Sequence, residues 1–227
     1  MEYIHNTEQF QFHNTVVALG KFDGMHKGHQ LIFDELIQYK QLGYQAAVFS
    51  FDRPPLNMLK HKHMNVIYTT NEKTKLLAKR GIDIYIEHPF TDEFSHLSPE
   101  DFVIKVLLEK TGMKVLVVGD DCGFGYKRQG NVELLERMSK EYDFKLIVIP
   151  KLELEGEIVS STRVRRLLSE GRIEEANRLM EDPFMICGPV VHGNHMGAEV
   201  LQMPTANQIP AEDKLLPPKG VYVSRIR

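Results

Sequence analysis

Short apolar runs rich in β-branched residues recur along the chain up to residue 149, each followed by a polar or glycine-containing loop. The runs span 15–19, 46–51, 83–86, 115–118 and 146–149. Between them, apolar residues spaced three and four apart predict helices over 30–39, 71–79, 99–109 and 132–142. Strands that alternate with helices are typical of a parallel sheet covered by helices, so the sequence predicts an α/β fold.

The pattern changes after the fifth run. Two short helices are expected over 161–169 and 173–180, and the sequence Glu-Asp-Pro that ends at Pro183 indicates a boundary. From Phe184 onward, Gly, Pro and short extended runs replace the helical periodicity, which suggests the opening of a β domain. We therefore expect one domain over 1–183 and a second segment over 184–227.

Composition narrows the function classes. Lys and Arg number 28 against 31 Asp and Glu, so the net charge of -3 does not favour nucleic acid as a partner. No apolar stretch reaches the ~18 residues of a membrane span, so no membrane partner is expected. Two distant cysteines, Cys122 and Cys187, cannot form a four-ligand zinc site. We expect a cytoplasmic enzyme with reduced thiols and no resident metal; protein partners are not readable.

The stretch from Gly20 to His29 lies directly between the first strand and the first helix, where open α/β sheets bind ligands. His26 and His29 are three residues apart at the helix start, beside backbone N–H groups that favour an anion. Gly24 and Gly28 let the backbone approach a polyphosphate closely. Ordinary polar histidines or a metal pair are the alternatives, and the intervening glycines favour a phosphate cradle. The spacing is not that of a P-loop.

The string Gly-x-Phe-Asp-Gly-x-His-x-Gly-His over 20–29 resembles the FMN adenylyltransferase module of bacterial bifunctional FAD synthetases, which are nucleotidyltransferases with a His-x-Gly-His element. The resemblance implies a Rossmann-like, doubly wound parallel sheet. It also implies that His26 and His29 contact the phosphates of ATP.

Two further stretches resemble the acceptor side of that family. Residues 49–55 resemble its Phe-Asp-Pro-His-Pro segment, with Arg53 and Pro54 in place of Pro and His. Residues 119–125 resemble its flavin and nucleotide loop, with Cys122 where Phe is usual.

A last stretch, 160–165, resembles the family's Ser-Ser-Thr-x-x-Arg motif, which grips the ATP phosphates. The resemblance then implies roles for the matching residues. The catalytic group is His26, His29, Ser161 and Arg165; the ATP-binding group is Gly20, Lys21, Phe22, Asp23, Gly28, Ser160 and Thr162; the FMN-binding group is Asn57, Asp121 and Phe124. ATP with Mg²⁺ and FMN are the expected substrates, and FAD and pyrophosphate the products.

The C-terminal segment resembles the start of the riboflavin kinase domain that follows this module, a partial β-barrel in which Thr205 and Asn207 match residues that contact Mg-ATP. Ala198, Glu199 and Gln202 depart from the family's Gly, Arg and Gly, and the sequence stops at residue 227, before the catalytic glutamate. We therefore expect a vestigial kinase segment without activity. Its apolar surface is expected either to pack on the first domain or to stay exposed in a fragment.

Three other functions stay open from the sequence. One is a nucleotidyltransferase for another small acceptor, such as a pantetheine, nicotinate or glycerol phosphate. Another is a flavin or nucleotide sensor without turnover, which the departures at 53, 54 and 122 keep open. The third is a bifunctional enzyme that also phosphorylates riboflavin.

Overall fold

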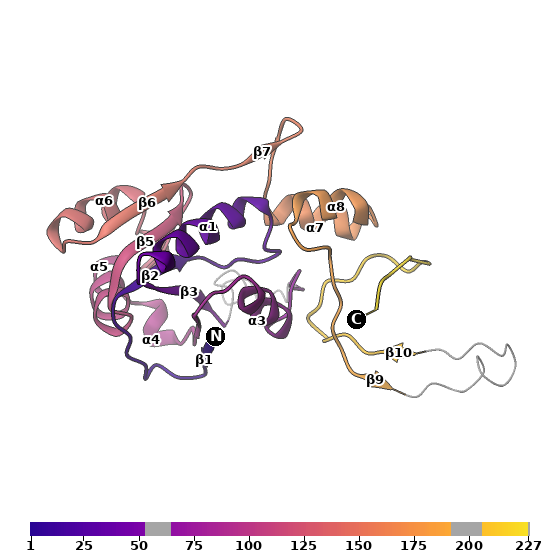
Figure 1. Ribbon diagram of the computed structural model, residues 1–227, viewed down its shortest axis with the longest axis horizontal. Helices are drawn as coiled ribbons and strands as arrows, with labels where there is room; N and C mark the ends of the chain where they lie inside the picture. The colour runs from indigo at the N-terminus through magenta and orange to yellow at the C-terminus, as the bar shows by residue number, and fades with distance from the viewer. Residues whose placement is uncertain (53–64, 192–205, 227) are drawn as a thin grey trace, which may run out of the picture.

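A six-stranded parallel sheet forms the centre of the computed structural model, which describes residues 1–52, 65–191 and 206–226 (Figure 1). The strand order is β1-β4-β3-β2-β5-β6. The strands are β1 (Glu2–His5), β2 (Thr15–Leu19), β3 (Gln45–Phe51), β4 (Ile84–His88), β5 (Met113–Gly119) and β6 (Lys145–Ile149). The predicted α/β fold with a parallel sheet is confirmed.

The sheet is doubly wound, as the family resemblance implied. From β2 the chain continues to β3 and β4 on one side, then crosses back to β5 and β6 on the other. The loops that leave the carboxyl ends of β2 and β5 therefore run in opposite directions, and the chain has a switch point between these neighbouring strands. Such a switch point is where open α/β sheets bind their ligands.

Helices cover both faces of the sheet. One face carries α1 (Lys27–Gln41), α3 (Thr70–Lys79), α7 (Ser161–Ser169) and α8 (Ile173–Leu179); the other carries α4 (Asp92–Ser95), α5 (Pro99–Asp101), η1 (Phe102–Lys110) and α6 (Val132–Glu141). In β2, Val16 and Ala18 face the first core and Val17 and Leu19 the second. Because both faces are buried, the strand sequences are continuously apolar rather than alternating.

Besides small elements that were not predicted, namely α4, η2 (Tyr126–Arg128), β7 (Glu153–Leu154) and β8 (Glu157–Ile158), two larger elements differ from the sequence prediction. The edge strand β1 was not predicted; it pairs with β4 in parallel register, Glu2 opposite Ile84. The helix predicted over 99–109 consists of a short α-turn, α5, that continues as a π-helix, η1. Apolar residues over so few turns do not distinguish the winding of a π-helix from that of an α-helix.

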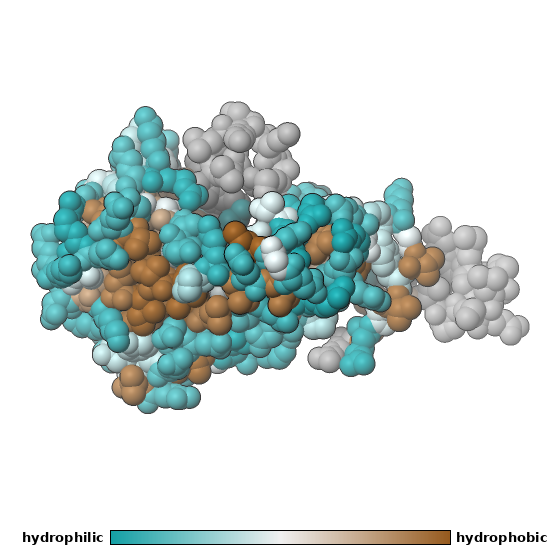
Figure 2. Space-filling model, turned by 90° about the horizontal axis from the view of Figure 1, so that it is seen from above, coloured by the Kyte–Doolittle hydropathy of each residue, from teal (hydrophilic) through white to brown (hydrophobic). Residues whose placement is uncertain are grey.

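Beyond α8 the chain runs beside α3 and out to an antiparallel pair, β9 (Val190–Val191) with β10 (Asn207–Gln208) (Figure 1). Hydrophobic atoms are exposed at this end of the molecule (Figure 2), where Val190 is 69% exposed. In contrast, Lys214 of the same segment is only 2% exposed and lies against the first part of the chain. The segment thus shows both expected outcomes: it packs on the first part of the chain around Lys214, and its apolar surface is exposed around Val190.

The small elements β7 (Glu153–Leu154) and β8 (Glu157–Ile158) form a hairpin just before α7, and η2 (Tyr126–Arg128) is a single 3₁₀ turn. Within residues 1–52, 65–191 and 206–226, no helix combines the length and the apolar content that a membrane span requires.

The packing of α1 gives a matched pair of stability variants. Leu36 is fully buried in the first core, whereas Leu42 at the end of α1 is 72% exposed. We expect Leu36→Ala to lower the free energy of unfolding by about 2–5 kcal/mol, because it removes packed methyl groups and leaves a cavity. Leu42→Ala should cost less than about 0.5 kcal/mol. Urea unfolding followed by circular dichroism measures both, and equal losses would contradict this core assignment.

Candidate functional site

The loop from Gly20 to His26 leaves the carboxyl end of β2 in a tightly wound conformation. Phe22 and Met25 have positive φ angles of 48° and 38°, which is rare for residues other than glycine. The ring of Phe22 is buried and packs against Phe33 of α1, with ring centroids 5.0 Å apart. A side chain at Gly20 would collide with this ring, because its Cβ would lie 2.8 Å from a Phe22 carbon. The buried Phe22 ring thus supports the conformation of the loop on its core side.

His26 and His29 lie face to face at the start of α1, with ring centroids 3.7 Å apart. His26 caps the helix through its backbone: its carbonyl accepts hydrogen bonds from the amides of His29 and Gln30 at 2.8 and 3.2 Å. The Nδ1 atoms of both rings are buried and have no hydrogen-bond partner among the described residues. Buried polar atoms usually have a partner, so these two nitrogens fit an oxyanion ligand.

Burial keeps both imidazoles neutral. It lowers the pKa of His26 from 6.5 to about 4, against the opposing effect of the Asp23 and Asp121 carboxylates. The pKa of His29 lies well below 6.5, mainly because of burial and further because of His26. Near pH 7 the pair therefore meets a ligand as uncharged groups that each carry one N–H donor.

The amino end of α7 reaches the same place. The Ser161 hydroxyl donates a hydrogen bond to the Asp23 carbonyl, and His26 forms an isolated antiparallel bridge with Met180. A Cβ on Gly28 would lie 3.2 Å from the His26 ring and 3.8 Å from the Val159 carbonyl oxygen. Glycine at this position therefore lets the amino ends of α1 and α7 approach each other, and the first backbone N–H groups of a helix favour an anion.

The Arg165 side chain joins α7 to the loop. Its guanidinium forms an ion pair with the buried Asp23 carboxylate at 2.5 Å and donates a hydrogen bond to the Asn65 carbonyl. The other Asp23 oxygen accepts from the amide of Ile67 at 2.9 Å. These contacts occupy one N–H group on each terminal nitrogen of Arg165, out of the five that a guanidinium has.

The remaining candidates for ATP binding surround this pair. Lys21 is half-buried, and burial lowers the pKa of its amine; the Asp23 carboxylate acts in the opposite direction and Arg165 adds to the lowering. Ser160 caps α7 by accepting the amide of Arg163 at 3.2 Å, and Thr162 is exposed in the first turn. The sequence-predicted group of ATP-binding and catalytic residues is thus brought to one place.

The loop after β5 leaves the strand that neighbours β2. Asp121 is exposed, pairs with Lys151 at 3.3 Å, and lies near enough to His26 for its charge to act on that pKa. The Cys122 thiol is largely buried, which raises its pKa to about 12 and keeps it protonated. The Phe124 ring is buried in the second core against Phe102, so it supports the loop and is not exposed to a ligand.

Other predicted positions are not part of this cluster. Asn207 is exposed in β10, where it pairs with Val191. Asn57, Thr205 and the departures at 53, 54, 198, 199 and 202 lie outside the described residues. Sequence reasoning missed Asn65 and Ile67, which hold the Asp23–Arg165 pair through backbone atoms. Backbone contacts leave no signal in side-chain motifs.

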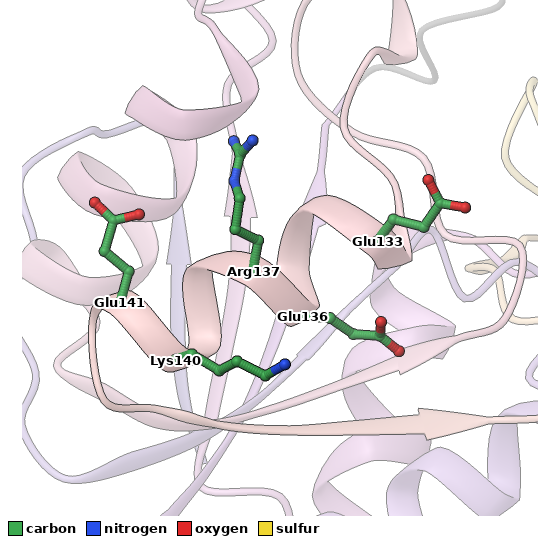
Figure 3. A pocket seen from close by; sticks show the side chains of 5 residues that line it. All are labelled: Glu133, Glu136, Arg137, Lys140 and Glu141. Atoms are coloured by element: carbon green, nitrogen blue, oxygen red, sulfur yellow. The ribbon is translucent and has the colours of Figure 1, made fainter.

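The described residues also line two hollows outside the His26–His29 pair. One is lined by Glu133, Glu136, Arg137, Lys140 and Glu141 of α6, whose side chains point in different directions (Figure 3). They do not converge on a common point, so this surface is not a candidate site. A smaller cavity behind the histidine loop is lined by residues that include Met25, Gln30 and Tyr68.

The donor set of the cluster suits a polyphosphate. Among residues 1–52, 65–191 and 206–226, no group of three or more His, Cys, Asp or Glu side chains has the arrangement of a metal site. The cluster offers imidazole N–H groups, helix amino ends, Lys21 and the remaining N–H groups of Arg165. These are donors and positive charges, which bind phosphate oxygens.

Comparison with known proteins identifies the family. The family model for FAD synthetase matches residues 8–163, and the model for riboflavin kinase matches residues 180–227. Bifunctional riboflavin kinase/FMN adenylyltransferases from Buchnera aphidicola subsp. Schizaphis graminum, Listeria monocytogenes and Escherichia coli K12 are 37%, 36% and 32% identical to this chain. The alignments cover 98%, 99% and 98% of the chain and 72%, 73% and 71% of those relatives.

A solved structure gives the same fold. A crystal structure of a Streptococcus pneumoniae protein, described as a macrolide-efflux protein, superposes with a TM-score of 0.84 at 29% identity, over 97% of this chain and 72% of that one. The term macrolide efflux describes that protein only. With a family model matching most of its length and relatives above 30% identity, the chain belongs to the FAD synthetase family of nucleotidyltransferases.

Proposed function

We propose that this chain transfers the AMP part of ATP to FMN, giving FAD and pyrophosphate. The observation that carries the proposal is the stacked His26–His29 pair at the switch point of the sheet, with two buried ring nitrogens that lack a partner in the described residues. Membership in the FAD synthetase family and the names of the relatives support FMN as the acceptor.

The triphosphate would lie against the loop from Gly20 to Gly28. His26 and His29 would donate hydrogen bonds to its oxygens, and Lys21 would add positive charge. Because the Ser161 hydroxyl already donates to Asp23, Ser161 would contact phosphate through its free backbone N–H at the start of α7, next to those of Ser160 and Thr162. Mg²⁺ would enter bound to ATP, as part of the substrate.

The chemistry needs no nucleophilic side chain. A phosphate oxygen of FMN would attack the α-phosphorus in line, forming the new P–O bond as the bond to the bridging oxygen of pyrophosphate breaks. Negative charge grows on the departing pyrophosphate, and the Arg165 N–H groups not held by Asp23 and Asn65 would stabilise it. Positioning and charge stabilisation supply the catalysis.

On the acceptor side, we assign FMN binding to Asp121, an exposed residue of the loop after β5 whose charge acts on His26. Phe124 would act by holding that loop, and a direct role for Asn57 rests on the sequence resemblance. We assign the transfer to residues 1–183 and treat 184–227 as a separate kinase-like segment. We further propose that the protein acts in the cytoplasm, where its free cysteines, Cys122 and Cys187, stay reduced.

The first prediction concerns His29. We expect His29→Ala to lower kcat for FAD formation from ATP, Mg²⁺ and FMN by about 100-fold or more, because a preorganised donor to the phosphates is lost. His13 is exposed and remote from the loop, so His13→Ala is the control and should keep full activity. Chromatography of the flavins measures the product. Unchanged FAD formation in His29→Ala would refute the proposed role of His29. If the unsubstituted chain bound ATP and FMN but released no pyrophosphate, the result would favour a sensor.

The neutral state of the histidines predicts a pH profile. Because both pKa values lie below 6.5, the imidazoles lose no charge as the pH rises through that value. We expect kcat/KM for ATP to show no falling limb between about pH 6 and 8. If one histidine had to act as a cation with an ordinary pKa value, kcat/KM would instead fall about tenfold per pH unit above about 6.5, and about 100-fold per unit if both had to.

We also propose that this chain does not phosphorylate riboflavin, in spite of the riboflavin kinase match over 180–227. The support is the departure of Ala198, Glu199 and Gln202 from the residues that the kinase motif has at those positions. Incubation with riboflavin, ATP and Mg²⁺ should therefore yield neither FMN nor FAD. FMN formation in this assay would show that the bifunctional alternative is correct.

A further inference from the structure

A lysine of the kinase-like segment is buried in the adenylyltransferase part of the chain. The side chain of Lys214 is 1% exposed, and its amine lies 2.6 Å from a carboxylate oxygen of Glu72, which is fully buried on α3. The same amine donates to the Ile67 carbonyl at 2.6 Å and lies over the rings of Tyr68 and Phe184. A charge at this depth persists only because every partner is in place.

The backbone around Lys214 binds the same strip of chain. The Val66 amide donates to the Asp213 carbonyl at 2.6 Å, and the Val66 carbonyl accepts the Leu215 amide at 2.7 Å. This pairing is an isolated parallel bridge between Val66 and Lys214. Residues 65–67 are therefore fixed from one side by the segment 213–215.

From the other side, residues 65–67 hold the phosphate cradle. The Ile67 amide donates to Asp23 and the Asn65 carbonyl accepts from Arg165, so the two ends of the Asp23–Arg165 ion pair are both bound by this strip. The Ile67 side chain also closes the space beside Gly24, where a Cβ would lie 3.0 Å from its Cδ1 atom. A displacement of Ile67 would move Asp23, and with it Arg165 and the histidine loop.

We propose that Lys214 is a positioning residue for the adenylyltransferase site: by binding the Ile67 carbonyl and Glu72, it sets the strip 65–67 that orients Asp23 and Arg165 toward the triphosphate. The proposal rests on the proposed function for its kinetic readout. It gives the kinase-like segment a role in ATP binding that requires no kinase activity. Lys214 itself touches none of the proposed ATP-binding side chains; it acts through residues 65–67.

The experiment compares the full chain with Lys214→Met, the double variant Lys214→Met/Glu72→Gln, and Lys219→Met, an exposed lysine of the same segment, as the control. Each is assayed for KM of ATP, KM of FMN, kcat and melting temperature. Lys214→Met leaves the Glu72 carboxylate buried with hydrogen bonds from the Thr69 and Cys187 amides but without its counter-charge, so this variant should melt earlier. The double variant removes both charges and should recover much of that loss.

The result expected is a KM for ATP raised about 5- to 20-fold in both Lys214 variants, with KM for FMN unchanged, because neither variant can bind the Ile67 carbonyl. A KM for ATP equal to that of the unsubstituted chain in the double variant would overturn the proposal, as would an equal rise of both KM values. If Lys214→Met does not fold, the charge-balanced double variant decides alone.

Calorimetric titration of ATP into the same proteins keeps the two proposals separable. If the unsubstituted chain binds ATP but forms no FAD, the proposed function fails, and the ATP affinity of the Lys214 variants still tests the positioning role. An affinity for ATP weakened by the same 5- to 20-fold supports it, and an unchanged affinity refutes it.

Discussion

The buried carboxylate of Asp23 joins parts of the chain that are distant in sequence. It is 6% exposed, and a carboxylate at that depth is stable only when it is paired and hydrogen-bonded. Its partners come from α7 and from residues 65–67, whereas Asp23 itself belongs to the loop after β2. The histidine loop therefore holds its shape only when α7 and residues 65–67 are docked. The candidate phosphate site therefore depends on tertiary contacts, although its most recognisable part is the short motif over 20–29.

Much of the fold was predictable because it depends on short-range patterns. Strands buried on both faces are continuously apolar and stand out from the amphipathic helices between them. The edge strand β1 escaped this reasoning because only its middle residues, Tyr3 and Ile4, are partly buried and its ends are exposed. Its place is set by pairing with β4 rather than by its own sequence.

The candidate site was predictable as a location and less so as a set of contacts. Motif resemblance named Phe22 and Phe124 beside His26, yet both rings are buried and shape their loops. A motif does not distinguish residues that face a ligand from residues that hold the loop. Lys214 was not predictable for another reason: a lysine between Asp213 and Leu215 is ordinarily solvated, and long-range contacts with Glu72, Ile67 and Tyr68 bury it.

The net positive charge of the site is smaller than its many hydrogen-bond donors suggest. Two rings stacked at 3.7 Å in a buried setting stay neutral, and the charge of Arg165 is largely offset by Asp23. The site thus offers many hydrogen bonds and little net positive charge. A low net positive charge limits the affinity of the site for a highly charged product. Weaker product binding favours product release.

The burial of Lys214 also has a consequence for biosynthesis. A ribosome releases the chain from its amino end, so Glu72 and the strip 65–67 emerge well before Lys214 is made. Until then, a buried Glu72 would have no counter-charge, and this cost weakens the packing of α3. If Lys214 positions the strip 65–67 as proposed, the histidine loop would reach its final order only after this downstream residue has been made, later than the strands of the sheet.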